Sequence, residues 1–123
     1  MIHHFDPFFS PRGGHASCSL DFPWGHARLR PEEFDRYVGE FRPHERVHAT
    51  ESYRRLLPLP RLTLADVELV IADAGACALQ WKEEWQHDHL PATEDWRDVA
   101  AVHLHATPRD LATAHVTAVL TKL

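Results

Sequence analysis

The chain has few of the residues and motifs from which common active sites are built. It has only five glycines and two cysteines, Cys18 and Cys77, without the Cys-x-x-Cys spacing of a zinc or redox motif. It also lacks His-Glu-x-x-His, Gly-x-Ser-x-Gly and a glycine-rich phosphate loop. Both cysteines fall at inward-facing positions of alternating segments, so we expect buried, reduced thiols. These absences argue against a recognisable enzyme, and we expect no cofactor.

Long apolar runs are absent as well. No stretch approaches the roughly 20 apolar residues that span a bilayer, and the beginning of the chain does not resemble a secretory leader. We therefore expect a cytoplasmic protein with no membrane contact. The 123 residues are 44% hydrophobic and 25% charged, as in one folded domain.

The net charge is −5 and is unevenly distributed. Arginines gather in residues 26–61, whereas residues 62–123 are strongly acidic. Because binding to a phosphate backbone requires clustered cations, this distribution argues against nucleic acid as a partner.

Periodicity predicts the secondary structure. Alternating apolar residues predict strands over residues 15–22, 26–30, 67–71, 76–82 and 98–106. Helical spacing predicts helices over residues 31–41, 50–57 and 108–123. Pro31 and Pro108 suit first helical positions, Thr107 with Asp110 suits a capping box, and Gly75 suits a left-handed turn residue. A helix over 77–86 is the alternative to a strand there.

This order of elements predicts an α+β fold for one domain over residues 15–123. We expect a mostly antiparallel sheet of about four to five strands, with about two to three helices packed on one face. Residues 1–14 contain Phe5, Phe8 and Phe9 without periodicity. They predict an irregular arm that is too apolar to be free, and that packs on this domain or on a neighbouring subunit.

Eleven histidines raise the question of a metal site. His103 and His105 would point to the same side of the predicted strand, and His87 with His89 could supply the other two ligands. His115, on the predicted C-terminal helix, would lie on the opposite side of the sheet. Because nothing in the pattern makes the two pairs converge, we predict no metal site; if one exists, those four histidines are its ligands.

Residues 81–98 combine three of the four tryptophans with six acids. The simpler interpretation is that the tryptophans anchor the core and the acids are solvated. The functional interpretation is an acidic, aromatic surface that binds a partner, since tryptophan is enriched in binding hot spots. The candidate partner-binding residues are Trp81, Glu84, Trp85, Asp88 and Trp96, together with Phe5, Phe8 and Phe9 of the arm.

These features favour a non-catalytic protein-interaction domain over an enzyme. It would be a subunit of a larger assembly, such as a phage or virion structural component, or a small acidic inhibitor of the immunity type. Its partner would then be a protein, either a basic target or further copies of the chain. One alternative is a small metal-dependent hydrolase that uses the His-x-His pairs. Another is a pH-responsive module, because histidines gain charge between about pH 7 and pH 5.5.

Overall fold

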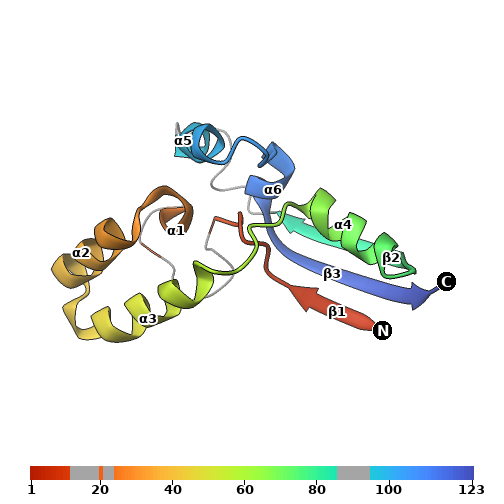
Figure 1. Cartoon of the computed structure of the whole chain (residues 1–123), viewed down its shortest axis with the longest axis horizontal. Helices are drawn as coiled ribbons and strands as arrows, with labels where there is room; N and C mark the ends of the chain where they lie inside the picture. Colours follow the sequence, from red (N-terminus) through yellow and green to blue (C-terminus); the bar gives the residue numbers. More distant parts are fainter. Residues whose placement is uncertain (12–19, 21–23, 86–94) are drawn as a thin grey trace.

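The structure, a computed structural model, describes residues 1–11, 20, 24–85 and 95–123 and shows a single small α+β domain (Figure 1). The strands are β1 (Ile2–Phe5), β2 (Ala76–Trp85) and β3 (Thr113–Lys122). The helices are α1 (Gly25–Arg28), α2 (Pro31–Phe41), the 3-10 helix η2 (Pro43–Glu45), α3 (Arg46–Leu56), α4 (Leu64–Asp73), α5 (Asp95–Val102) and α6 (Pro108–Ala112). The α+β class is confirmed. The described residues hold three strands and more helices than expected.

The sheet is antiparallel, in the order β1-β3-β2, with β3 in the centre. The predicted helix over 108–123 is therefore wrong beyond its first turn. Thr107 does cap α6, with its hydroxyl accepting from the Asp110 N–H, but the helix ends at Ala112 and the chain continues as β3. Residues 113–121 are rich in threonine and valine, which suit a strand. Val116 and Ala118 are buried on one face, so the segment follows the alternating pattern of a strand and not the helical spacing.

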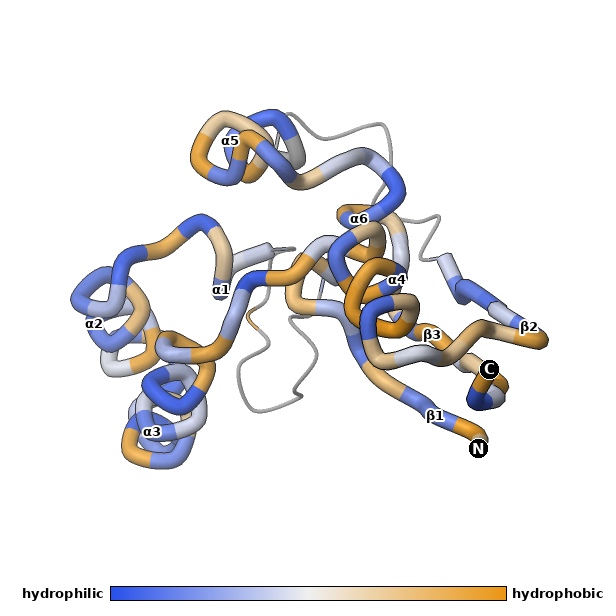
Figure 2. The backbone as a smooth tube through the Cα atoms, turned by 45° about the vertical axis from the view of Figure 1, so that its right-hand side comes forward, coloured by the Kyte–Doolittle hydropathy of each residue, from blue (hydrophilic) through white to orange (hydrophobic). Residues whose placement is uncertain are grey.

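Helix α4 occupies the segment predicted as a strand over 67–71. Thr63 begins it with a capping box: its hydroxyl accepts from the Asp66 N–H, and the Asp66 carboxylate accepts from the Thr63 N–H. Seven of its ten residues are apolar, so both alternation and helical spacing fit the segment. The capping box at Thr63 favours the helix over the strand. Most of α4 carries the hydrophobic colour in Figure 2.

Strand β2 confirms the prediction over 76–82 and excludes the alternative helix there. Gly75, with φ of 68°, forms the left-handed turn between α4 and β2, as expected. The register on β3 slips between Ala78 and Gln80, which leaves Leu79 as the extra residue of a bulge.

Two further strand predictions are wrong. Residues 98–106 form the end of α5 and the turn after it, because Val99 is buried in a core cluster and the following alanines favour a helix. Of residues 26–30, those at 26–28 belong to helix α1, and Leu29 and Arg30 are the caps of α1 and α2. The predicted strand over 15–22 lies, apart from Leu20, outside the described residues, as does Cys18.

Helices α2 and α3 form a hairpin close to the prediction. Pro31 is at the first position of α2, and the Glu33 carboxylate accepts from the Arg30 N–H at 2.8 Å. Phe34 is fully buried and stacks on Tyr53 of α3, with ring centroids 4.0 Å apart. Phe41, at the end of α2, is 60% exposed. The hairpin core consists of Phe34, Val38, Ala49 and Tyr53.

The central core joins segments that are far apart in the chain. It consists of Phe9, Trp24, Ala27, Val99 and Leu111, with Phe8 and Ala106 packed against it. The expected arm thus begins with a strand, β1, and then packs on its own domain. The Trp24 indole donates to the Phe9 carbonyl at 3.1 Å. No helix in the described part combines the length and apolar character that crossing a membrane would require.

Candidate functional site

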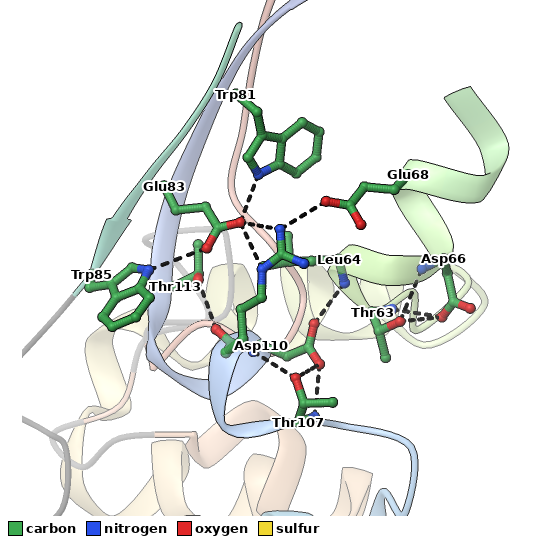
Figure 3. A network of polar contacts seen from close by, with 11 residues as sticks. Thr63, Leu64, Asp66, Glu68, Trp81, Glu83, Trp85, Thr107, Asp110 and Thr113 are labelled. Atoms are coloured by element: carbon green, nitrogen blue, oxygen red, sulfur yellow. Dashed lines mark hydrogen bonds and ion pairs between the residues drawn. The ribbon is translucent and has the colours of Figure 1, made fainter. Parts of the chain in front are cut away.

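Trp81 and Trp85, two predicted partner-binding residues, share the carboxylate that lies between them on β2. The Trp81 indole donates to Glu83 Oε1 at 2.7 Å and the Trp85 indole to Oε2 at 3.3 Å. All three side chains alternate onto one face of the strand, as Figure 3 shows. Trp81 is half-buried and meets the edge of Phe5, whereas Trp85 is 51% exposed. Trp85 is therefore the indole that a partner could reach.

Arg109 completes this network from α6. Its Nε donates to Glu83 Oε1 at 2.8 Å and its Nη2 donates to Glu68 Oε1 on α4 at 2.9 Å, and Nη2 also contacts Glu83. The hydrogen bond from Arg109 lowers the pKa of Glu83, and Glu83 followed by Glu68 raises the pKa of Arg109. Both groups are therefore charged at neutral pH, and they hold the two indoles in place.

Asp110 makes the second link between α6 and α4. Its Oδ2 accepts from the Thr107 N–H at 2.7 Å and from the Thr107 hydroxyl at 2.6 Å. Its Oδ1 accepts from the Leu64 N–H, at the start of α4, at 2.6 Å. The residue is 2% exposed. One buried carboxylate thus satisfies donors at the N-termini of two helices and fixes α4 against α6 (Figure 3).

A groove of about 250 Å³ lies between α4 and β2. Its described lining comes from these two elements alone: Glu68, Ile71, Ala72, Ala76, Cys77, Ala78 and Trp81. The central strand β3 contributes no described residue to this lining. Cys77, expected to be fully buried, is a half-buried free thiol in the groove wall. Apart from Glu68, the walls are apolar or weakly polar.

Large apolar side chains are exposed on the same two elements. Leu69 and Val70 on α4 are 63% and 57% exposed, and Leu79 on β2 is 66% exposed. A surface helix normally buries its apolar residues against its own domain, but α4 is apolar on both sides. The two elements together carry five acids and one lysine. We call this region, defined by Leu69, Val70, Leu79, Trp85 and the groove, the α4–β2 surface.

The His-x-His pair does not have the predicted arrangement. His103 is 5% exposed and His105 is exposed, and their ring centroids lie 6.4 Å apart at nearly a right angle. His103 Nε2 donates to the Ala27 carbonyl at 3.1 Å. Val102 and Leu104, on either side of His103, are exposed. His87 and His89 lie outside the described residues. Within the ranges that the structure describes, no three His, Cys, Asp or Glu side chains are placed to hold a metal ion.

A second histidine is buried nearby, and the sequence did not single it out. His26 is 4% exposed and its Nε2 donates to the Phe8 carbonyl at 2.6 Å. Burial lowers the pKa of His26 to about 4 against the opposing effect of this hydrogen bond, and nearby His103 and Arg61 lower it further. Burial likewise lowers the pKa of His103. Both side chains are neutral donors in the central core at neutral pH.

His115 lies on the central strand and not on a helix. Its Nδ1 is 2.5 Å from the Asp6 carboxylate, and its ring stacks on His4 at a centroid distance of 6.0 Å. This histidine pair links β1 to β3.

The remaining predicted partner-binding residues are spread over the fold. Glu84 is exposed and pairs with Lys82 at 3.2 Å. Phe8 is half-buried, and Phe9 is fully buried in the chain's own core, so Phe9 offers no surface to a partner. Asp88 lies outside the described residues, and so does the side chain of Trp96 on α5.

Sequence reasoning missed Arg109, Glu68 and the double role of Asp110. The repeated pattern Thr-x-x-Asp, at Thr63 and again at Thr107, was a usable signal for two helix starts. No local signal links Arg109 to Glu83, because 26 residues separate them.

Comparison of the chain with models of protein families, with curated proteins and with solved structures found no match in any of the three. The class that the structure defines is therefore the general one: a small α+β domain with a three-stranded antiparallel sheet in its described part.

Proposed function

We propose that this chain is a non-catalytic protein-interaction domain, and that it binds its partner through the α4–β2 surface. The observation that carries the proposal is the exposure of Leu69, Val70, Leu79 and Trp85 on two elements that pack on each other. Exposed apolar residues that gather in one region, with polar residues around them, are typical of protein-binding sites.

The chemistry of this surface indicates the kind of partner. Trp85 offers a large apolar face, and its indole is held by Glu83, so little conformational entropy is lost when a partner covers it. The acids of α4 and β2 attract a basic protein and disfavour an acidic one. An assembly subunit and a small acidic inhibitor of a basic target both fit these properties, in the cytoplasmic setting that the sequence favours.

The alternative, a metal-dependent hydrolase, gains no support from the described residues. His103 uses its Nε2 to hold the Ala27 carbonyl, and the exposed ring of His105 makes a T-shaped contact with Phe9, nearly at a right angle to the His103 ring. The pair therefore lacks the shared orientation that a common metal ion needs.

The test compares three forms of the untagged full chain. They are the wild type, the double variant Leu69→Ser with Val70→Ser, and the control Val47→Ser, which changes an exposed apolar residue on α3. Native mass spectrometry of each form reports bound partners, copy number and any bound metal together. Circular dichroism verifies that all three are folded.

We expect the wild type and the control to retain the same bound protein after capture from a cell extract, and the double variant to lose it. Equal retention by all three forms, or a wild-type monomer that never retains a protein, would contradict the proposal.

A further inference from the structure

We propose that the outer edge of β2 takes up an extended segment of a partner protein as an added strand, and that one apolar side chain of this segment enters the groove between α4 and β2. This inference rests on the proposed function and deepens it, because it names the form of the partner and its place on the α4–β2 surface.

The edge itself is the first argument. In the described part of the chain, β2 pairs with β3 alone, so the backbone N–H and C=O groups along its other side have no strand partner there. β2 is ten residues long, whereas β1 at the opposite edge has four. A long edge strand is a template for another extended chain. β2 is therefore the stronger of the two templates.

The register shows where the added strand would pair. β2 is irregular between Ala78 and Gln80 and again between Glu84 and Trp85. Residues 80–84 form the regular run between these two points. The bulge and the exposed Lys82 interrupt the edge, as in proteins that avoid unspecific pairing. An edge of this kind selects partners that also fit its side-chain contacts.

The groove supplies such a contact. It lies beside the first half of β2, and its described walls come only from β2 and α4. Apolar cavities of about 150 Å³ already admit a benzene ring, so about 250 Å³ is enough for one aromatic or branched aliphatic side chain. In strand addition, backbone hydrogen bonds supply much of the affinity and pockets for alternate side chains supply the specificity.

Charge indicates the rest of the partner sequence. Glu84 and Asp73 are exposed on β2 and at the end of α4. Lys82, the only lysine of the two elements, forms an ion pair with Glu84, so the uncompensated charge near the groove is the carboxylate of Asp73. A segment with Lys or Arg next to its apolar anchor is therefore complementary to this edge. Trp85, at the end of β2, would cover the end of the added strand.

The probe is a random ten-residue peptide library displayed on phage and selected against the immobilised full chain. We expect the selected peptides to combine β-branched or aromatic residues with Lys or Arg. When a selected peptide is added, hydrogen exchange should slow at backbone amides of β2 and remain unchanged in α2 and α3.

Two matched variants test the groove. Ala72→Phe places a ring at the groove wall, whereas Ala65→Phe places the same ring on another exposed position of α4 that does not line the groove. We expect Ala72→Phe to weaken peptide binding about tenfold or more and Ala65→Phe to change it by less than about twofold.

Three results would overturn the inference. The first is peptide binding without protection of the β2 amides, and the second is equal binding by both alanine variants. The third is self-association in sedimentation equilibrium with concentration-dependent protection of β2, which would make a second copy the occupant. If the Leu69→Ser, Val70→Ser variant still loses its natural partner in these cases, the proposed function stands and strand addition alone fails.

Discussion

The hairpin core and the central core of this protein are built from different kinds of contact. The hairpin core comes from α2 and α3, which follow each other in the chain. The central core brings together Phe9, Trp24 and Ala27 with Val99 and Leu111, from opposite ends of the chain. The hairpin core depends on contacts between neighbouring segments. The contacts of the central core join distant segments, so forming it requires long stretches of chain to close into loops.

The two cores also differ in their buried polar groups. In the hairpin, the Tyr53 hydroxyl donates to the Leu29 carbonyl, and the Asp35 carboxylate on the surface accepts from Arg46 and Thr50. The central region buries His26, His103 and Asp110, each with a specific partner. A buried polar group costs free energy when its partner is lost. The central core is thus the more sensitive to mutation and to acid, and the hairpin is the more self-contained.

The largest expected effect is that of Trp24→Ala in the central core. Trp24 is fully buried, and its loss leaves both a large cavity and an unpaired Phe9 carbonyl. We expect the free energy of unfolding to fall by about 5 kcal/mol, against a total of roughly 5–15 kcal/mol for a domain. Urea denaturation followed by circular dichroism measures this.

Trp85→Ala is the matched control, because Trp85 is half-exposed. We expect Trp85→Ala to lower the free energy of unfolding by no more than about 1 kcal/mol. Equal losses for the two tryptophans would mean that the central core is not the main source of stability.

Phe34→Ala tests the independence of the hairpin core. It removes the ring that stacks on Tyr53, and we expect the free energy of unfolding to fall by about 3–4 kcal/mol. Because the two cores are separate clusters, amide exchange should accelerate in α2 and α3 first. Tryptophan fluorescence should remain native, since all four tryptophans lie outside the hairpin. Simultaneous loss of both signals would show that the two cores unfold as one.

The same contrast explains which elements the sequence could predict. The start of α2, the cap at Thr107 and the turn at Gly75 depend on residues within a few positions of each other, and all three are confirmed. Such local signals act wherever the segment lies in the fold.

Elements that depend on distant partners were mispredicted. Residues 113–122 fit a helix by spacing, but Val119 pairs with Ile2, near the other end of the chain. No local pattern reveals that β1 and β2 flank this segment. In residues 98–106, α5 buries Val99 and exposes Val102, and the turn after the helix buries His103, so alternation along a strand does not describe this segment.

The candidate site was predictable only in part. The segment around Trp81 and Trp85 stood out by composition, and the structure places the two indoles on one face of β2. The groove could not be predicted, because its other wall is α4, which alternation assigned to a strand. The composition of residues 81–98 therefore indicated where this surface lies, but its shape depends on the packing of α4 on β2, which the sequence did not predict.

The central core should also respond to pH. His26 has a pKa of about 4 in the folded chain and about 6.5 when unfolded. The unfolded state therefore binds more protons between these values, so stability is complete above about pH 6.5 and falls as the pH drops towards 4. The lowered pKa of His103 acts in the same direction. Protonation of His26 over this pH range lowers the free energy of unfolding by a total on the order of 3 kcal/mol.

His26→Gln keeps a donor for the Phe8 carbonyl but does not titrate. We expect the difference in unfolding free energy between pH 7 and pH 4.5 to shrink by about 2–3 kcal/mol in this variant. His44→Gln, at a highly exposed position next to the hairpin, should leave the difference unchanged. An unchanged pH dependence in His26→Gln would show that other groups cause the acid sensitivity.

The smallest predicted effect compares one carboxylate from each region. Asp110→Asn replaces a buried acceptor of three hydrogen bonds with an amide, whose NH₂ group would face the Thr107 donors or the Leu64 N–H. We expect the free energy of unfolding to fall by about 2 kcal/mol, together with faster amide exchange at the start of α4.

Asp35→Asn weakens surface contacts with Arg46 and Thr50 that water and salt can replace. Its loss should be smaller and should shrink further in high salt, whereas the loss in Asp110→Asn should not. Since Asp110 is one of the two contacts that hold α4 on α6, Asp110→Asn should also weaken binding at the α4–β2 surface, and Asp35→Asn should not. Equal binding by both variants would mean that the surface keeps its shape without the Asp110 contact.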